Sequence, residues 1–378
     1  MAIALVTNVL APYRVPLYAL LAERYGVEVL CFGAEASYVS AWLGDLDAQI
    51  AAAPFPARRI AGPYAALALG RRYDAAIAPI AGGAMLPATY LGMRARGKPF
   101  VLWGSVWAHP RGGKATLGWP LVRRIYGHAD AVVTYGEHVR RYVTRYRGDA
   151  GDDDVMIAPQ SVEANLFGRP VGGEEVAAWR AEHALPADGP LVLYVGRLVP
   201  EKGIEELLAA WRLLAPGPAS LDAPRPLPSP TLAVIGDGPL GPAVDATPAA
   251  KLLGPLPRER LPVAYAAADA LVVPSIPTPR FREPWALVCN EALHQGTPVV
   301  ATTAVGAVAG GLIRHDETGL VVPPSNPRAL AHAIERLLAD RPLRERLGAA
   351  GRAALAGHTY AAMADAFGVA LARAGALR

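Results

Sequence analysis

Short apolar runs alternate with segments of helical periodicity along the first half of the chain. The apolar runs have the length of buried strands and cover residues 2–7, 27–32, 74–80, 99–103 and 129–134. Residues 15–24, which follow the first run, carry apolar side chains at helical spacing. Because strands that alternate with helices are typical of a parallel, doubly wound sheet, the pattern predicts an α/β fold.

The same order of strand, loop and helix starts again at Leu191. Apolar runs cover residues 191–195, 231–235, 252–256, 271–275, 299–301 and 320–322, and helical segments cover 204–214, 261–269 and 326–338. A chain of 378 residues is long for one core, so the repeat predicts two doubly wound, Rossmann-like domains. We expect them at residues 1–168 and 169–357, with a linker near 167–173 and a last helix within 358–378.

The composition, with 52% hydrophobic and 19% charged residues, is that of a globular protein. Two uncharged stretches, 75–93 and 292–313, contain glycines and prolines that would break a membrane-spanning helix, so we expect buried strands and helices there. Cys31 and Cys289 form no disulfide framework and no signal-peptide pattern begins the chain, which favours a cytoplasmic protein. Six prolines in residues 215–230 predict a stiff connecting loop.

The net charge of +4 is unevenly distributed along the chain. Residues 1–160 hold 17 basic and 12 acidic side chains, whereas the remainder holds 20 and 21. Arginines concentrate near the end of that first part: Arg123, Arg124, Arg140, Arg141, Arg145 and Arg147. They predict either a face for the anionic inner surface of the plasma membrane or a solvated helical surface. No nucleic-acid-binding motif or aromatic platform accompanies the charge, so we expect no nucleic-acid partner.

Two carboxylates, Glu283 and Glu291, stand eight positions apart before the buried run at 299–301. Proline is favoured at the first position of a helix, so Pro284 predicts a helix start that leaves Glu283 in the preceding loop. Free N–H groups at a helix start bind anions, above all phosphate. Here they would belong to Ala286, Leu287 and Val288. Glu291, about two turns further in, could accept hydrogen bonds from two neighbouring hydroxyls.

Two cations, Arg197 and Lys202, flank the loop that follows the strand at 191–195. Both could converge on a diphosphate, whose charge grows as it leaves a reacting centre and is then stabilised by fixed cations. Arginine offers a planar fork and lysine a compact point charge, so each suits different phosphate oxygens. The alternative interpretation is a pair of solvated surface cations.

These motifs resemble those of family 4 of the nucleotide-sugar-dependent glycosyltransferases, whose signature is two glutamates separated by seven residues. The resemblance rests on Glu283 and Glu291, on Gly196-Arg197-Leu198 with Lys202-Gly203, and on Gly236-Asp237-Gly238-Pro239. It implies a GT-B fold with two domains that face a cleft and a last helix that crosses back to the first domain. It also implies a retaining, front-face transfer of a sugar from a nucleotide-diphosphate donor to a hydroxyl acceptor, without a metal ion or a tightly bound cofactor.

The resemblance assigns roles to the donor-side residues. Arg197 and Lys202 would bind the diphosphate, Glu291 the ribose hydroxyls and Glu283 a hydroxyl of the donor sugar. Backbone groups near the donor would come from Gly196, Gly254, Leu287 and Val288. Trp285-Ala286 stands where relatives usually have Phe-Gly, so the added methyl group is expected to affect the choice of donor.

Candidate acceptor residues follow strands of the first domain. Tyr13 and Arg14 lie in the loop after the first strand, although a surface salt bridge would explain Arg14 equally well. His109 lies after the run at 99–103, where relatives often place a histidine close to the reacting sugar, and it is the fourth candidate catalytic residue beside Glu283, Arg197 and Lys202. The acceptor class stays open between a glycan, a glycolipid and a small molecule.

Two other functions remain open. A nucleotide-sugar epimerase could share the GT-B fold, and an NAD-dependent oxidoreductase could use residues 236–241, which match G-x-G-x-x-G. Prolines at 239 and 242 disfavour the continuous helix start that such a pyrophosphate site requires. Asp152-Asp153-Asp154 contains an Asp-x-Asp pattern, but a solvated acidic loop explains it better than a metal site, and no other ligand spacing indicates a metal.

Overall fold

The computed structural model describes residues 1–33, 45–80, 83–109, 111–148, 152–214 and 229–377. The chain divides into two compact units, Met1–Ser161 with His358–Arg378, and Val162–Gly357. This division lies ahead of the predicted linker at residues 167–173, because α7 (Ala164–Phe167) already belongs to the second unit, where Phe167 is buried beside Tyr265. Most of the proline-rich loop predicted at 215–230 lies outside the described residues.

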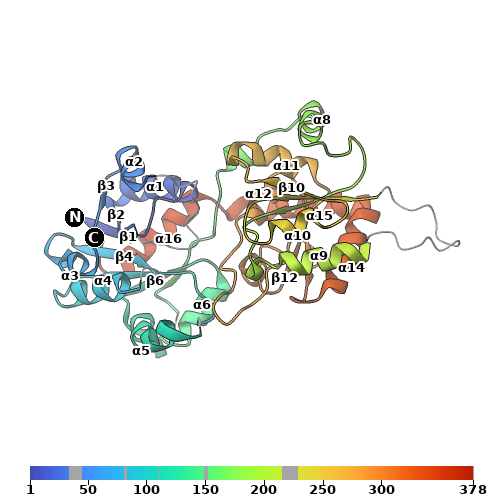
Figure 1. Ribbon diagram of the computed structural model, residues 1–378. Coiled ribbons are helices and arrows are strands. Elements are labelled where there is room, and N and C mark those ends of the chain that lie inside the picture. The colour runs from blue at the N-terminus through green and yellow to red at the C-terminus, as the bar shows by residue number, and fades with distance from the viewer. Residues whose placement is uncertain (34–44, 81–82, 110, 149–151, 215–228, 378) are drawn as a thin grey trace. The chain divides into compact units, whose positions relative to one another are not determined.

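The first unit contains a parallel sheet with strand order β3-β2-β1-β4-β5-β6-β7 (Figure 1). Its strands are β1 (Ile3–Thr7), β2 (Val27–Cys31), β3 (Ala57–Arg59), β4 (Ala75–Pro79), β5 (Phe100–Gly104), β6 (Ala131–Thr134) and β7 (Val155–Ile157). The predicted doubly wound parallel sheet is confirmed. The pattern missed β3, since this short edge strand carries two arginines and no apolar run.

Helices cover both faces of this sheet. The elements are η1 (Pro12–Arg14), α1 (Val15–Tyr25), α2 (Leu46–Ala51), α3 (Pro63–Leu67), η3 (Leu69–Arg71), α4 (Met85–Arg94), α5 (Gly113–His128), α6 (Glu137–Thr144) and α16 (Tyr360–Arg373). Residues of α1 and α16 share one apolar core with the sheet, and residues of α3, α4, α5 and α6 share the other. In this way the last helix of the chain completes the first unit, where Phe367 packs edge-on against Trp103 with ring centroids 5.1 Å apart.

The second unit contains a six-stranded parallel sheet in the order β10-β9-β8-β11-β12-β13. Its strands are β8 (Leu191–Val195), β9 (Thr231–Ile235), β10 (Ala250–Gly254), β11 (Ala270–Val273), β12 (Val299–Thr302) and β13 (Leu320–Val322). Three of them, β8, β9 and β13, have the predicted bounds. β10 begins two residues before the predicted run at 252–256.

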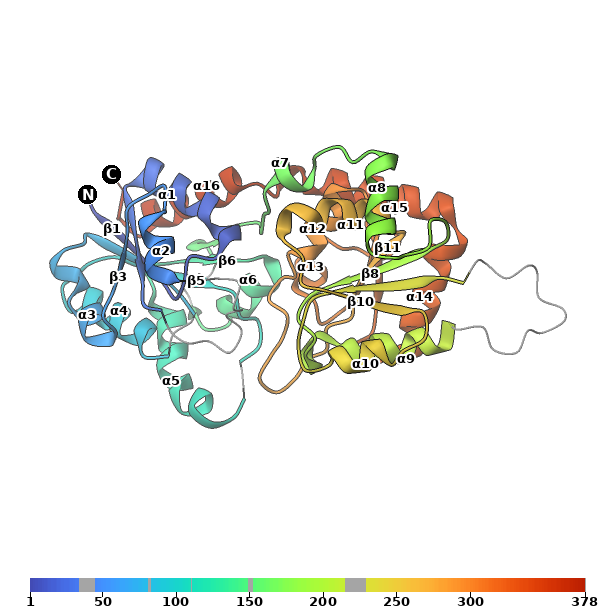
Figure 2. The same ribbon diagram turned by 45° about the horizontal axis from the view of Figure 1, so that its top comes forward.

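The helical elements of the second unit are α7, α8 (Gly173–Glu182), η5 (Pro200–Lys202), α9 (Ile204–Leu214), α10 (Gly241–Asp245), η6 (Arg258–Arg260), α11 (Leu261–Ala267), α12 (Val288–His294), α13 (Gly306–Ala309), α14 (Pro327–Ala339), α15 (Arg341–Ala354) and η7 (Leu355–Gly357). Helices α9 and α14 contribute to one apolar core with the strands, and α11 packs on α8 and α12 (Figure 2). Within the described residues, no helix combines the length and apolar character needed to cross a membrane.

The helix that carries Glu291 begins at Val288 and not at Pro284 as predicted. The segment before it is held in extended form by the start of α13: the Gly306 N–H donates to the Glu283 carbonyl at 3.1 Å, and the Ala307 N–H donates to the Trp285 carbonyl at 2.8 Å. Contacts from a segment twenty residues away therefore override the preference of Pro284 for a helix start. As a result, Glu291 lies in the first turn of α12 and not two turns further in.

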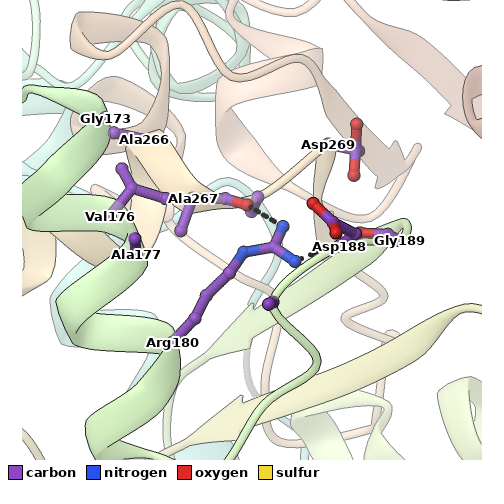
Figure 3. Close-up of a pocket in the computed structure, with 11 residues that line it drawn as sticks. Gly173, Val176, Ala177, Arg180, Asp188, Gly189, Ala266, Ala267 and Asp269 are labelled. Atoms are coloured by element: carbon purple, nitrogen blue, oxygen red, sulfur yellow. Dashed lines mark hydrogen bonds between the residues drawn. The ribbon is translucent and has the colours of Figure 1, made fainter.

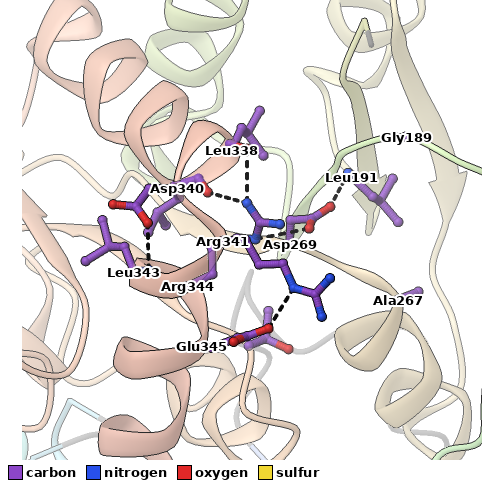
Figure 4. A network of polar contacts seen from close by, with 12 residues as sticks. Gly189, Leu191, Ala267, Asp269, Leu338, Asp340, Arg341, Leu343, Arg344 and Glu345 are labelled. Atoms are coloured by element: carbon purple, nitrogen blue, oxygen red, sulfur yellow. Dashed lines mark hydrogen bonds and ion pairs between the residues drawn. The ribbon is translucent and has the colours of Figure 1, made fainter. Parts of the chain in front are cut away.

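A polar network ties α14 and α15 to the amino ends of two strands (Figure 4). Arg344 donates to the carbonyls of Leu337 and Leu338, at 2.7 and 3.0 Å, and so satisfies groups that the end of α14 leaves without intrahelical donors. Its guanidinium lies 3.3 Å from Asp269, whose other oxygen accepts the Leu191 N–H at 2.8 Å. This network stabilises the edge of the sheet at which β8 and β11 begin.

Candidate functional site

The loops that follow β8, β9 and β10 are hydrogen-bonded to one another at the carboxyl edge of the second sheet. The Gly196 N–H donates to the Ile235 carbonyl at 3.0 Å, and the Gly236 N–H donates to the Gly254 carbonyl at 2.9 Å. The Leu198 N–H donates to the Asp237 carbonyl at 2.7 Å. Since ligands of open α/β sheets bind outside the carboxyl ends of strands, this layer of loops is the expected place for a site.

Gly203 holds the cation-bearing loop close to β11. Its φ of 70° lies in the left-handed region, and an added Cβ would lie 2.0 Å from the Pro274 carbonyl oxygen. Only glycine satisfies both conditions without a shift of the backbone. The close approach brings Lys202, which precedes Gly203, beside the segment that leads from β11 to Glu283.

Lys202 and Glu283 form an ion pair. The Lys202 ammonium donates to Glu283 Oε2, and Ser275 Oγ donates to the same oxygen at 3.1 Å. The side chain of Glu283 is only 7% exposed, and burial of a carboxylate requires such compensation. The motifs placed both residues in one site, but they did not predict that the two bind each other. Nor did they indicate Ser275, which no sequence signal distinguishes from any other polar residue after a strand.

Arg197 lies on the same loop as Lys202, and its side chain is less buried than that of Lys202. Its guanidinium is 3.7 Å from Glu201 Oε1, and a third of its side chain is exposed. The hydroxyl of Tyr194, a residue of β8, donates to the Arg197 carbonyl at 2.8 Å, and this hydrogen bond fixes the loop backbone to the strand. The loop is thus held in place while the guanidinium keeps solvent access, as an anion-binding arginine needs.

Glu291 accepts a hydrogen bond of 2.5 Å from the hydroxyl of Tyr265, which is a buried residue of α11. Burial raises the pKa of Glu291 to about 7, against the lowering effects of the Tyr265 hydrogen bond and of the Arg258 charge. The carboxyl group therefore takes up a proton at a higher pH than an exposed glutamate does. Tyr265 was missed from the sequence, where it is one more apolar position of a helix.

Trp285 and Ala286 shape the backbone between the two glutamates. The Trp285 side chain is buried, and its indole N–H donates to Asn290 Oδ1 at 2.8 Å. Ala286 adopts a φ of 74°, a left-handed conformation that costs an alanine energy and that glycine adopts readily. The next two amides, of Leu287 and Val288, lie at the start of α12, where N–H groups lack intrahelical acceptors.

Gly254 ends β10 beside this layer of loops. It has a φ of 70°, and no other atom lies within 4 Å of the position that a Cβ would occupy. The backbone here therefore borders open space, in agreement with a place where a planar ring could approach.

In the first unit Arg14 is buried, which is neither the surface salt bridge nor the accessible cation that the sequence suggested. It donates to the Tyr135 hydroxyl at 2.8 Å and to Gln160 Oε1 at 2.6 Å, and its guanidinium carbon lies 4.8 Å from the centre of the Trp103 ring. Arg14 therefore joins the ends of β1, β5, β6 and β7. Its neighbour Tyr13 is more than a third exposed.

His109 stacks on Trp119 of α5, with ring centroids 3.8 Å apart and an interplanar angle of 31°. The stacking fixes the imidazole against α5 in the first unit.

In the glycine-rich loop at 236–241, the backbone of the neighbouring loop occupies the space beside the glycines. A Cβ at Gly236 would lie 2.0 Å from the Gly196 oxygen, and one at Gly238 would lie 2.6 Å from the Leu198 oxygen. These glycines therefore permit loop packing. The helix that follows, α10, has only five residues, which disfavours the predicted NAD alternative.

Two of the three aspartates before β7 are engaged in ion pairs. Asp152 pairs with Arg140, and Asp154 lies 3.9 Å from Arg147. Among the residues that the structure describes, no three His, Cys, Asp or Glu side chains are grouped so that they could hold a metal ion.

A cavity of about 360 Å³ lies elsewhere in the second unit (Figure 3). Gly189 and Asp269, which line it, precede β8 and β11, so the cavity borders the amino ends of these strands. Arg180 points into it but donates to the carbonyls of Pro186, Gly189 and Ala267 at 2.9–3.2 Å. The guanidinium thus serves to fix the surrounding backbone, and the cavity is separate from the candidate site.

Comparisons with known proteins match this part of the chain. Residues 175–354 match the family described as glycosyl transferases group 1. The D-inositol 3-phosphate glycosyltransferase of Corynebacterium glutamicum is 33% identical over 217 residues, which are 53% of this chain and 47% of the relative. The protein of the same name from Frankia alni is 36% identical over 54% of this chain and 50% of the relative. The chain thus spans about half the length of these curated relatives.

Solved structures match nearly the whole chain at low identity. Anabaena Alr3699/HepE in complex with UDP aligns over 98% of this chain and 99% of that protein, with a TM-score of 0.77 and 18% identity. Sucrose-phosphate synthase from Thermosynechococcus elongatus aligns over all of both chains, with a TM-score of 0.73 and 23% identity. With two parallel, Rossmann-like sheets in one chain, these similarities show that the protein has the predicted GT-B fold.

Proposed function

We propose that this protein is a retaining glycosyltransferase of family 4 that moves a sugar from a nucleotide-diphosphate donor to a hydroxyl acceptor. The observation that carries the proposal is the Lys202–Glu283 pair at the carboxyl edge of the second sheet, inside the segment that matches the group 1 family. The pair joins a cation suited to phosphate with a carboxylate suited to a sugar hydroxyl.

The diphosphate is proposed to bind between Arg197 and Lys202. When the bond from the sugar to the diphosphate breaks, negative charge grows on the leaving oxygens, and the two cations stabilise that charge most in the transition state. Because Lys202 is already fixed by Glu283, little reorganisation accompanies the reaction. A front-face reaction, in which the departing phosphate accepts the proton of the acceptor hydroxyl, requires no further base and no metal ion.

The nucleoside is proposed to bind beside α12 and β10. One oxygen of Glu291 binds Tyr265, and its second oxygen would accept from the ribose hydroxyls. Gly254 would border the base, Leu287 and Val288 would donate amide N–H groups, and Glu283 would bind the donor sugar.

The names of the relatives suggest where to look for substrates. Because Alr3699/HepE is described in complex with UDP and with UDP-glucose, uridine donors are the first to test. Hydroxyl acceptors to test are a phosphorylated cyclitol, as in the names of the curated relatives, a glycan and a lipid-linked sugar. Tyr13 and His109 are the proposed acceptor contacts, whereas Arg14, which is buried, would position the loop that carries Tyr13.

Calorimetric titration with UDP, GDP, ADP, dTDP and NAD tests this function. We expect one nucleoside diphosphate to bind, and Lys202→Ala to weaken it roughly ten- to a hundredfold, the equivalent of a charge-assisted contact of about 1.5–3 kcal/mol. Lys251→Ala is the matched control, since Lys251 lies in the same unit but donates to the carbonyl of Ala184. Binding of NAD alone, or equal affinities of the two variants, would contradict the proposal. Turnover of the sugar donor in the absence of any acceptor would indicate an epimerase.

A further inference from the structure

The arginines that concentrate between residues 123 and 147 divide into two groups in the structure. Three of those on or after α6 have protein partners: Arg140 pairs with Glu137 and Asp152, Arg141 pairs with Glu137, and Arg147 is buried against the carbonyls of Tyr126 and Ala129. The fourth, Arg145, is exposed. With the nearby Asp153 also exposed, this part of the surface has little excess charge. The excess of exposed basic side chains therefore lies mainly on the neighbouring helix α5.

Helix α5 and its leading turn carry only positive charge. Residues 111–128 contain four basic side chains and no acidic one. Arg111, Arg123 and Arg124 are exposed, and none of them pairs with a carboxylate among the described residues. Arg123 lies over the ring of Tyr146, with its guanidinium carbon 5.7 Å from the ring centre, which orients the charge without neutralising it.

The same helix exposes apolar side chains on its outer face. Leu117 is 88% exposed, and Pro120, one turn later, is exposed as well. Arg124, seven positions after Leu117, continues this face at helical spacing and is exposed. Leu121 is half-buried and packs against the core of the first unit. Behind it, α5 packs against α4 and α6, at the margin of the first unit (Figure 2). An exposed leucine with cations before and after it is the arrangement of helices that lie at a lipid surface.

We propose that α5 is a docking surface for anionic phospholipid headgroups, with Leu117 inserted among them and Arg111 and Arg124 bound to their phosphates. The charge of the helix selects this occupant, because a surface with three exposed arginines and no acidic residue in 111–128 attracts an anionic membrane and gains little from a neutral one. The surface goes beyond the donor site, since it lies in the other unit and shares no residue with it. It would bring the enzyme to a lipid-borne acceptor.

Cosedimentation with vesicles tests the surface directly. The full chain is mixed with vesicles of phosphatidylglycerol and phosphatidylcholine in equal parts, and with vesicles of phosphatidylcholine alone. We expect binding to the first kind only, and weaker binding as salt is added. The double variant Arg111→Gln/Arg124→Gln should reduce partitioning roughly twenty-five-fold, at about fivefold for each basic residue. Leu117→Ser should reduce it roughly tenfold through lost apolar insertion.

Matched controls place the effect on α5. Arg141→Gln removes the same charge from α6, and Tyr64→Ser removes an aromatic side chain that is also 88% exposed, on α3. Both should bind vesicles as the unchanged protein does, and all variants should keep their affinity for the nucleoside diphosphate. No binding of the unchanged protein to anionic vesicles, or equal losses in the control variants, would overturn the proposal while leaving the donor site intact.

Discussion

The backbone at Ala286 offers a sharp test of how the candidate site is built. Ala286 has a φ of 74°, and Ala249, an exposed residue between α10 and β10, has a φ of 57°. Both alanines hold the left-handed conformation, in which Cβ crowds the following carbonyl oxygen. The substitution Ala286→Gly removes this crowding and introduces the glycine that the family resemblance implies at this position.

The expected gain in stability follows from three terms. Relief of the left-handed conformation contributes about 1–2 kcal/mol. The greater freedom of glycine in the unfolded chain offsets about 0.4–1 kcal/mol of it. Loss of a half-buried methyl group offsets a further few tenths of a kcal/mol. The net gain is about 0.5 kcal/mol, which raises Tm by roughly 1–2 °C in a domain of this size.

Ala249→Gly is the matched control, because it relieves similar strain far along the chain from the glutamates and loses no buried methyl group. Thermal denaturation should show a rise in Tm for both variants, with the control gaining at least as much. Calorimetry should separate them: a looser backbone at residue 286 preorganises the Leu287 and Val288 amides less, so nucleotide affinity should fall a few-fold in Ala286→Gly alone.

The reasoning fails if Ala249→Gly raises Tm and Ala286→Gly lowers it, because contacts of the Ala286 methyl group would then outweigh the strain. It fails in a different way if both variants bind the nucleotide equally. In that case the backbone before α12 would have no part in the donor site.

Three further predictions concern single residues. Nucleotide affinity should fall as the pH drops below about 7, because burial raises the pKa of Glu291 to about 7 and a protonated carboxyl group accepts hydrogen bonds from ribose hydroxyls poorly. Glu291→Gln keeps an acceptor for Tyr265 and should bind the nucleotide weakly at every pH; parallel pH profiles of the variant and the unchanged protein would refute the role of Glu291. Gly203→Ala should cost about 2–4 kcal/mol in chemical denaturation, against about 1–2 kcal/mol for Gly254→Ala, since both have a φ of 70° but only at Gly203 would the new Cβ lie 2.0 Å from a carbonyl oxygen. Equal costs would argue against the contact. Arg14→Met should lower the free energy of unfolding by about 1–3 kcal/mol, since Gln160 loses a buried hydrogen bond; unchanged stability would instead favour a ligand-binding role for Arg14.

The sheets could be predicted from the sequence because buried parallel strands are apolar on both faces. The runs at 191–195, 231–235 and 320–322 match β8, β9 and β13 at both ends. β3 could not be found in this way, since an edge strand of three residues with two arginines has no such pattern. The predicted start of α12 at Pro284 was wrong because the preference of proline for a helix start is a local effect. The hydrogen bonds of Glu283 and Trp285 with the start of α13 form only in the folded chain.

The ion pair between Lys202 and Glu283 shows why motifs locate a site better than they describe it. Each residue belongs to a separate motif, and 80 positions of sequence lie between them. They meet because β8 and β11 are neighbours in the sheet, so the loop after β8 and the segment after β11 leave the same edge side by side. This is also where the strand order turns from β10-β9-β8 to β11-β12-β13, the place at which open α/β sheets bind ligands. Strand order therefore explains both the pair and its position. Because the pair links the two proposed roles, loss of Lys202 removes the ion pair of the buried Glu283 carboxylate, so nucleotide binding and the stability of the second unit should depend on both residues together.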